Sequence, residues 1–178
     1  WNELKRIIKP NGAIVLFGSE PFSSALRMSN IKNYKYDWIW KKDAGSNFAT
    51  VKYQPMKEHE TISVFNTKSY NPIKQERVGA RKGKKTISYD SGRKNSVYGD
   101  MNGIGKFEVD VLRYPSSVQS FKRERGLHPT QKPVALLEYL VKTYTNENEL
   151  VLDFTMGSGT TGLACMNTKR NFIGIERD

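Results

Sequence analysis

Two carboxylates and a glycine-rich turn near the end of the sequence are the residues best suited to chemistry. Asp153 lies in a short apolar run, Leu150–Phe154, that is typical of a buried parallel strand. Gly157-Ser158-Gly159 breaks this run, and the following residues predict a helix with Ser158 or Thr160 as its cap. A strand, a glycine turn and a helix start gather unpaired backbone N–H groups at the positive end of a helix dipole. The pattern predicts a cofactor lying close against the backbone, because glycine has no side chain in the way.

The charges beside this turn distinguish between cofactors. Gly157-x-Gly159-x-x-Gly162 also matches the dinucleotide fingerprint, but Asp153 stands where a pyrophosphate would feel its charge. Glu176 closes a second apolar run about 20 residues past the glycines, where a ribose diol is usually held. S-adenosylmethionine carries an ammonium, a sulfonium and a ribose, so these features favour it. A nicotinamide oxidoreductase and a tight turn without any ligand are the alternatives.

The distribution of charge indicates a polyanionic partner. The 178 residues carry a net charge of +11, and the segment Thr67–Gly126 holds fourteen Lys and Arg against six Asp and Glu. Tyr and Phe residues interleave with these cations, and no helical period is sustained. We expect an inserted, loop-rich lobe that contacts nucleic acid, with a solvated basic surface as the alternative. The cations expected to bind DNA are Arg81, Lys82, Lys84, Lys85, Arg93, Lys94, Lys122, Arg123 and Arg125.

Cysteine and histidine usage limits the other kinds of site. Cys165 is the only cysteine and falls on the apolar face of the helix after the glycine turn, so we expect a buried thiol and a reducing compartment. His59 and His128 are far apart and form no metal-binding pattern. We expect no membrane partner, because no apolar run approaches membrane-spanning length and the N-terminus is not a signal peptide.

The remaining segments predict the elements that position these residues. Trp1–Ile8 has helical spacing, Ala13–Gly18 is a continuous apolar strand, and Pro21–Ser29 is a second helix. Glu60–Phe65 is a further strand. This alternation of helices and strands is typical of an α/β fold.

Four aromatic residues alternate along the predicted strand Tyr34–Lys42. Tyr34, Tyr36, Trp38 and Trp40 would share one face of it. Such a face is either part of the core or a stacking wall for a planar ligand such as a flipped-out base. The periodicity is compatible with both interpretations.

A proline-bracketed segment, His128–Pro133 (HPTQKP), precedes a predicted helix, Val134–Thr143. The prolines alone explain it as a rigid helix entry. The polar residues Thr130, Gln131 and Lys132 at the helix start are also well placed to contact a carboxylate.

Taken together, these segments resemble the amino-group DNA methyltransferases, which modify adenine N6 or cytosine N4. The resemblance rests on Val151–Thr161, Phe172–Glu176 and His128–Pro133, and it covers the chain apart from the Thr67–Gly126 lobe. The order of the motifs resembles the permuted subgroup, in which the target-recognition region and HPTQKP precede the cofactor loop. Leu4–Gly18, Tyr36–Lys42 and His59–Phe65 are similar to family segments as well.

The resemblance implies a Rossmann-like, circularly permuted α/β methyltransferase with an inserted basic target-recognition lobe. Residues 1–66 would form the catalytic-side half, 67–126 the lobe and 127–178 the cofactor-binding half. It implies methyl transfer from S-adenosylmethionine to an exocyclic amino group of double-stranded DNA, adenine N6 being favoured. A cytoplasmic bacterial or phage protein of a restriction-modification system is expected, and a homodimer is compatible with it.

The resemblance also assigns residues. S-adenosylmethionine would be held by Asp153, Phe154, Thr155, Gly157, Ser158, Gly159, Thr160, Thr161 and Glu176. His128, Thr130, Gln131 and Lys132 would close over its methionine end, with Phe17, Gly18 and Ser19 nearby. Tyr36, Trp38 and Trp40 would border the pocket for the target base, and the basic lobe would read DNA.

One departure from the family pattern concerns catalysis. The family's tetrapeptide of the Asp/Asn/Ser-Pro-Pro-aromatic type, expected upstream of Trp1, does not occur in these 178 residues. The sequence also begins without Met in a helical segment and stops soon after Glu176. We therefore expect an internal portion of a longer enzyme whose catalytic residues are not in this sequence. A non-catalytic DNA-binding remnant is the alternative.

Overall fold

The computed structural model describes residues 1–76, 86–87, 107–108, 112–124, 126 and 131–177. The chain divides into two compact units, one formed by Trp1–Pro72 with Ser116–Asp178 and the other by Ile73–Pro115. In the second unit β4 (Gln75–Glu76) pairs with β7 (Leu112–Arg113), and β5 (Thr86–Ile87) pairs with β6 (Phe107–Glu108), both antiparallel. This unit is narrower than the lobe predicted at 67–126.

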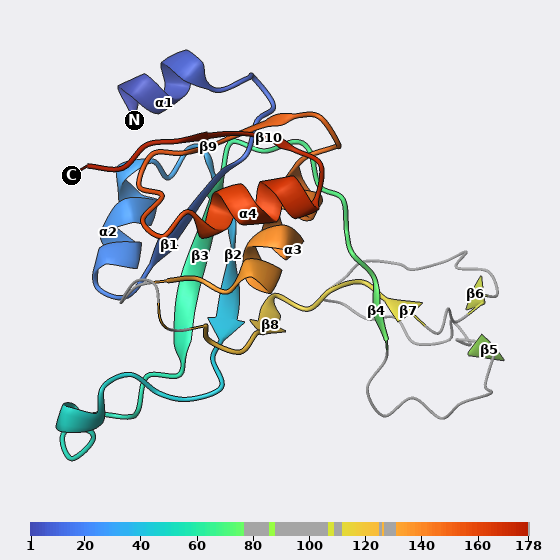
Figure 1. Cartoon of the computed structure of the whole chain (residues 1–178). Helices are drawn as coiled ribbons and strands as arrows, with labels where there is room; N and C mark the ends of the chain where they lie inside the picture. Colours follow the sequence, from blue (N-terminus) through green and yellow to red (C-terminus); the bar gives the residue numbers. More distant parts are fainter. Residues whose placement is uncertain (77–85, 88–106, 109–111, 125, 127–130, 178) are drawn as a thin grey trace. The chain divides into compact units, whose positions relative to one another are not determined.

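A four-stranded sheet forms the centre of the larger unit (Figure 1). Its order is β1-β3-β2-β8, with β1 at Ile14–Gly18, β2 at Tyr34–Lys41, β3 at His59–Phe65 and β8 at Val118–Ser120. β3 runs antiparallel to both β1 and β2, whereas β8 runs parallel to β2. β8 belongs to this sheet, although it lies within the range 67–126 predicted for the lobe.

A separate β-α-β segment carries the glycine turn. β9 (Leu150–Asp153) and β10 (Asn171–Gly174) are parallel neighbours, and α4 (Thr160–Asn167) connects them. The parallel strand predicted at Leu150–Phe154 is confirmed, but its predicted burial is wrong. Leu150 is 55% exposed and Leu152 is 36% exposed. Strand alternation explains this difference, because Phe172 of β10 faces α4 whereas the two leucines lie on the opposite face.

Three further helices and one short 3-10 turn complete the described part of the larger unit. α1 spans Asn2–Ile7, α2 spans Phe22–Ser29, α3 spans Val134–Tyr144, and a 3-10 turn covers Phe48–Thr50. The predicted helices and strands are confirmed, and most of their boundaries agree with the structure to within two residues. Boundaries are the least reliable part of such predictions. The α/β fold class is therefore confirmed. None of the described helices is long and apolar enough to cross a bilayer.

The hydrophobic core lies between one face of the sheet and helices α3 and α4. Trp38 is 3% exposed and Trp40 is 2% exposed, and both pack in this core. Trp38 Nε1 donates to the Tyr144 hydroxyl at 2.6 Å, and Trp40 Nε1 donates to the Phe121 carbonyl at 2.9 Å. Because both polar N–H groups are satisfied, the indoles can be buried at low cost. The structure gives the two tryptophans the packing role.

The prediction that four aromatic residues share a face is wrong for Tyr34. The register of β2 against β3 shifts between Tyr34 and Tyr36, so Tyr34 pairs with Phe65 whereas Tyr36 pairs with Val64. Such an irregularity turns the preceding side chain to the other face of the sheet. The ring of Tyr34 lies 5.8 Å from that of Phe65 between centroids, away from the Trp38 face.

The predicted burial of Cys165 is confirmed, and it leads to a test of the fold. The residue is 0% exposed on α4, and burial raises the pKa of its thiol to about 11. A rise of this size cuts the thiolate fraction near neutral pH by about a hundredfold, and packing blocks access in addition. A thiol-specific chromogenic reagent should therefore label the native chain at least about a hundredfold more slowly than the chain in denaturant. Equal rates would contradict the packing of α4.

Candidate active site

Asp153 ties the two sides of the glycine turn together. It is the last residue of β9, and its Oδ1 accepts a hydrogen bond from the backbone N–H of Thr155 at 3.1 Å. Its Oδ2 accepts from the Thr161 hydroxyl, in the first turn of α4, at 2.5 Å. Residues 154–159, between the end of β9 and the start of α4, form the glycine loop. The carboxylate thus fixes both ends of this loop, and its negative charge stays beside the start of α4, where the helix dipole stabilises it.

The start of α4 differs from the predicted cap. Gly159 occupies the N-cap position with φ of 73°, a left-handed conformation that favours glycine. Among the described side chains none caps this helix. The Ser158 and Thr160 hydroxyls instead lie 2.9 Å from each other. The prediction that Ser158 or Thr160 caps α4 is therefore wrong, since the turn required a residue free to adopt positive φ.

A second glycine sets how closely the helix and the strands pack. A Cβ built on Gly162, in the first half of α4, would lie 2.8 Å from Cε1 of Phe172 on β10. Real side chains essentially never approach so closely. α4 therefore rests against β10 at a separation that only glycine permits.

Glu176 reaches back to the glycine loop from beyond the end of β10. Its Oε2 accepts a hydrogen bond from the backbone N–H of Gly157 at 2.6 Å. The N–H groups of Thr155 and Gly157 are thus both bonded to carboxylates. A diphosphate would need such donors and would also meet two negative charges, so this geometry disfavours a nicotinamide dinucleotide. It suits a ligand that presents cationic groups and hydroxyl donors.

Lys132, from the HPTQKP segment, meets Phe17 and an acidic residue at one edge of the main sheet. Its Nζ lies 3.2 Å from Glu60 Oε2 and 5.2 Å from the centre of the Phe17 ring. Glu60 Oε1 accepts a second, 2.6 Å hydrogen bond from Lys42. The structure therefore brings Phe17 and Lys132 together, with Glu60 between two lysines. His128 and Thr130 lie outside the described residues, and Gln131 is half-buried.

Gly18 and Ser19 follow Phe17 at the end of β1. A Cβ on Gly18 would lie 2.6 Å from the Ser23 hydroxyl, so α2 packs tightly against this residue. The backbone N–H of Ser23 donates to the Ser19 carbonyl at 3.0 Å. Both residues thus hold the start of α2 in place, and their predicted contact with a cofactor remains a prediction.

Glu60 has a shifted pKa, which makes stability depend on pH. Its burial alone would raise the pKa of the carboxyl, but the hydrogen bond from Lys42 and the charge of Lys132 outweigh burial and hold the pKa below its ordinary value of 4.5. The unfolded chain therefore binds this proton at a higher pH than the folded chain. The stabilisation is complete above about pH 4.5 and is lost as the pH falls through the lower, folded-state pKa.

We expect Glu60→Gln to lower the free energy of unfolding by about 1–3 kcal/mol at pH 7, because it leaves Lys42 without its charged acceptor. The difference from wild type should shrink as the pH falls from 5 toward 3. Urea denaturation at a series of pH values measures it. Glu147→Gln is the matched control, since Glu147 is exposed and lies 3.9 Å from Lys169. A difference that stays constant with pH would contradict the proposed ionisation.

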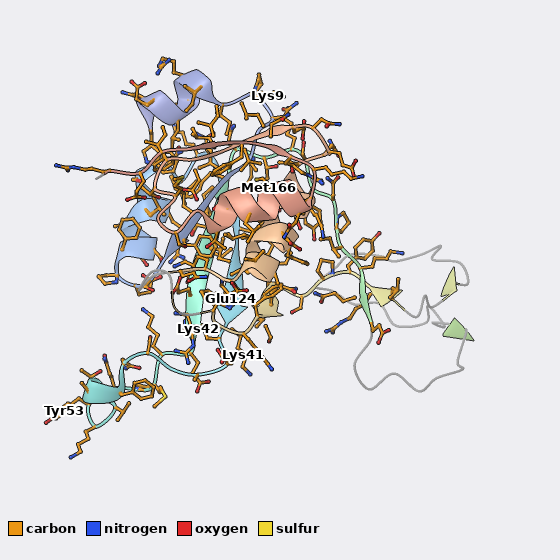
Figure 2. The ribbon with its side chains drawn as sticks, in the orientation of Figure 1. Lys9, Lys41, Lys42, Tyr53, Glu124 and Met166 are labelled. Atoms are coloured by element: carbon orange, nitrogen blue, oxygen red, sulfur yellow. The ribbon has the colours of Figure 1, made fainter. Side chains whose placement is uncertain are left out.

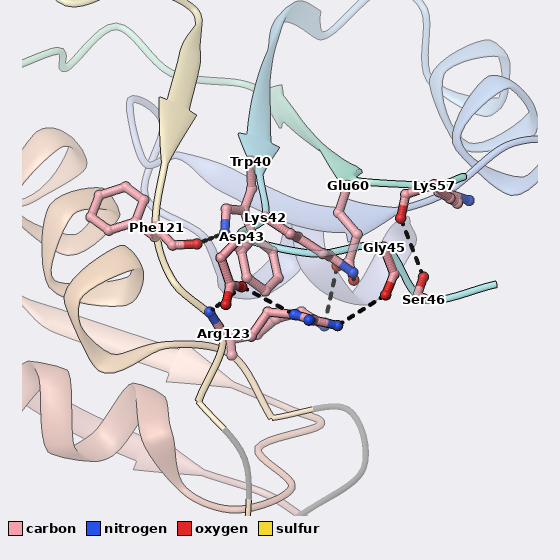
Figure 3. A network of polar contacts seen from close by, with 10 residues as sticks. Trp40, Lys42, Asp43, Gly45, Ser46, Lys57, Glu60, Phe121 and Arg123 are labelled. Carbon is pink, nitrogen blue, oxygen red and sulfur yellow. Dashed lines mark hydrogen bonds and ion pairs between the residues drawn. The ribbon is translucent and has the colours of Figure 1, made fainter. Parts of the chain in front are cut away.

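Few of the cations expected to bind DNA lie in the described part of the chain. Arg123 is partly buried and serves the fold, because its Nε lies 3.1 Å from Asp43 Oδ1 and its Nη1 donates to the Gly45 carbonyl at 3.2 Å (Figure 3). Its backbone N–H also donates to Asp43, and these bonds lower the pKa of that carboxyl. Lys122 is exposed. The remaining predicted residues, Arg81, Lys82, Lys84, Lys85, Arg93, Lys94 and Arg125, lie outside the described residues.

Sequence reasoning missed the role of Glu60. One signal was present: β3 places Glu60 opposite Trp40 in the register, on the face whose other residues form the core. An acidic side chain at an inward position of a buried strand requires a partner. Sequence spacing could not identify those partners, because Lys42 and Lys132 come from different segments of the chain.

The comparison with protein families decides the class of this chain. A family model described as DNA methylase, N6_N4_Mtase, matches residues 1–178. The chain belongs to this DNA methylase family. The family resemblance expected from the sequence motifs is thereby confirmed, whereas the permuted motif order remains a prediction.

Curated relatives of this DNA methylase chain are type II methyltransferases. M2.MboI of Moraxella bovis is 39% identical over 104 residues, which cover 57% of this chain and 35% of that protein. M2.LlaDCHI of Lactococcus lactis subsp. cremoris is 30% identical over 184 residues, which cover 100% of this chain and 60% of that protein. The DNA methylase chain thus spans only part of the length of these relatives.

Solved structures share the fold of the DNA methylase chain. The M1.HpyAVI–SAM complex superposes with a TM-score of 0.66 at 29% identity and covers 98% of this chain and 72% of its own. The cytosine-N4-specific PvuII DNA methyltransferase gives a TM-score of 0.62 at 15% identity and covers 96% of this chain and 61% of its own. At 15% identity, the similarity to the PvuII enzyme shows a shared fold only.

Proposed function

We propose that this chain binds S-adenosylmethionine and serves methyl transfer to an exocyclic amino group of double-stranded DNA, with adenine N6 as the acceptor. The observation that carries the proposal is the pair of carboxylates beside the glycine loop, Asp153 and Glu176, which accept hydrogen bonds from the backbone N–H groups of Thr155 and Gly157. This arrangement belongs to a chain whose whole length matches the DNA methylase family. The proposal includes action in the cytoplasm, on DNA read by the 67–126 region, by a monomer or a homodimer.

The residues present fit this cofactor chemically. The two carboxylates offer acceptors for an ammonium group and for the hydroxyls of a ribose. The side chain of Phe154 is 44% exposed next to them and offers an apolar surface for an adenine ring. When bound, S-adenosylmethionine supplies an electrophilic methyl group on a sulfonium. Asp153, Glu176 and the loop backbone would hold and orient it.

Positioning is the main contribution that the described residues make to such a reaction. An exocyclic amino nitrogen is a poor nucleophile, because its lone pair is delocalised into the base, and the base must leave the duplex before it can react. Alignment of the nitrogen with the methyl group and the sulfur supplies much of the rate enhancement. The Pro-Pro-aromatic tetrapeptide, whose acceptors would bind the amino N–H groups, does not occur in these 178 residues.

The cofactor part of the proposal is tested by titration calorimetry of the 178-residue chain. We expect S-adenosylmethionine and S-adenosylhomocysteine to bind and NAD not to bind under the same conditions. Binding of NAD alone would overturn the proposal in favour of an oxidoreductase. Binding of none of the three would also count against it.

The transfer part is tested with the full-length protein and tritiated S-adenosylmethionine on mixed-sequence DNA. We expect label in DNA above a heat-killed control, and chromatography of the digested nucleosides should place it in N6-methyladenine. Label in N4-methylcytosine would correct the acceptor and keep the reaction. DNA binding without any label would favour a non-catalytic remnant.

A further inference from the structure

The loop between β2 and β3, residues 42–58, carries large apolar side chains into solvent. Tyr53 is 88% exposed, Phe48 61%, Val51 43% and Met56 41%. Figure 2 shows Tyr53 at the end of this loop that lies farthest from the sheet. Water solvates such side chains poorly, so a cluster of them on one loop marks a surface that meets a partner.

Internal hydrogen bonds fix the shape of this β2–β3 loop. Asn47 Oδ1 accepts from the backbone N–H of Lys57 at 2.6 Å, and Asn47 Nδ2 donates to the Pro55 carbonyl at 3.1 Å. The Thr50 hydroxyl accepts from Gln54 Nε2 at 2.7 Å. A Cβ on the buried Gly45 would overlap the Met56 side chain, so the two sides of the loop touch. The loop therefore presents its aromatic rings from a folded support, which lowers the entropic cost of binding.

The base of the β2–β3 loop is tied to the predicted cofactor residues. Arg123 bonds Asp43 and Gly45 on one side, as Figure 3 shows. Lys42, the first residue of the loop, shares the Glu60 carboxylate with Lys132. The loop thus leaves the sheet at the edge where Phe17 and Lys132 meet.

We propose that the β2–β3 loop is a nucleic-acid contact, in which Phe48 and Tyr53 stack against bases. Three exposed cations accompany the rings: Lys52 lies between them in sequence, and Lys41 and Lys122 lie at the adjoining ends of the β2 and β8 segments. Aromatic rings flanked by cations suit nucleic acid, since the rings stack on bases while the cations meet phosphates. A second copy of this net-positive chain would bring like charges together. The proposal rests on the function proposed above and names a DNA contact outside the 67–126 region.

The test compares DNA binding by three variants of the full 178-residue chain. Fluorescence anisotropy with a labelled mixed-sequence duplex that contains a central unpaired base gives the affinities at fixed salt. We expect Phe48→Ala/Tyr53→Ala to bind this DNA at least roughly thirtyfold more weakly than wild type, because two stacking contacts of about 1–3 kcal/mol each are lost. Tyr53→Ala alone should show part of this loss. Met166→Ala is the matched control, because Met166 is 76% exposed on α4.

Two further measurements make the outcomes distinguishable. All variants should keep the thermal unfolding midpoint and the calorimetric affinity for S-adenosylmethionine of wild type. Unchanged DNA affinity of the double variant would overturn the inference and leave the proposed function intact. A change in oligomeric state by sedimentation velocity, with DNA affinity unchanged, would overturn it in favour of a contact between two copies. Absence of S-adenosylmethionine binding by wild type itself would instead count against the proposed function.

Discussion

Replacing Glu176 by alanine is expected to weaken S-adenosylmethionine binding about tenfold to a hundredfold. Its carboxylate is bonded to the Gly157 N–H at the glycine loop and is the proposed acceptor for the ribose hydroxyls. A hydrogen bond to a charged group contributes roughly 1.5–3 kcal/mol, and tenfold in affinity corresponds to about 1.4 kcal/mol. Titration calorimetry of the purified chain measures the change.

Two controls separate this effect from a change in the fold. Glu176 is exposed, so Glu176→Ala should leave the thermal unfolding midpoint within about 2 °C of wild type. Glu176→Gln keeps one acceptor and loses the charge, and we expect an intermediate affinity. Glu147→Ala removes an exposed carboxylate elsewhere and should change nothing. An unaltered affinity of Glu176→Ala would refute the assignment of this residue to the cofactor site.

Trp40→Ala is expected to destabilise the chain by about 3–5 kcal/mol, the range for truncating a large buried aromatic side chain. Trp40 is 2% exposed, and its Nε1 bonds the Phe121 carbonyl. The substitution leaves a cavity and also deprives that carbonyl of its donor. Since small domains are stable by only about 5–15 kcal/mol, much of the native population should be lost. Urea denaturation followed by far-ultraviolet circular dichroism measures the loss.

Trp40→Phe separates the contribution of the indole N–H hydrogen bond from that of the buried apolar volume. It keeps most of the apolar volume and removes only the N–H donor, so we expect a loss of about 1–3 kcal/mol. If Trp40 bordered an open base pocket instead of the core, both variants would be nearly as stable as wild type and would differ from it only in DNA affinity. That result would reverse the packing role assigned to the tryptophan.

The local pattern of the sequence predicted most of the fold, because each signal acts within a few residues. Continuous apolarity identified β1, and prolines identified the starts of α2 and α3. The loss of Tyr34 from the aromatic face could not be predicted, since the register shift arises from how β2 pairs with β3, a segment further along the chain. The antiparallel pairings of β3 depend on the same long-range contacts.

The candidate site also combines features that local sequence predicts with features that depend on long-range contacts. The glycine turn and Asp153 were predictable, because their spacing follows from one strand-turn-helix unit. The cap of α4 was predicted wrongly, since propensity favours Ser or Thr whereas the turn geometry required Gly159 at positive φ. The bond from Gly157 to Glu176 joins residues 19 apart in sequence, and only the folded chain shows it. Arg123 looked like a DNA contact by composition, but Asp43 engages it across the fold.

The close contact between Gly162 and Phe172 has a mechanical consequence. Because one added methyl group at residue 162 would overlap the Phe172 ring, α4 cannot move nearer to β10. Thr161 of α4 donates to Asp153 at the end of β9, and Gly157 of the loop donates to Glu176 just beyond β10. β9, α4 and β10 therefore form one rigid β-α-β unit. In the proposed cofactor site, this unit would hold the backbone of Asp153 and Glu176 at a constant separation and would so select the length of the ligand bound between them.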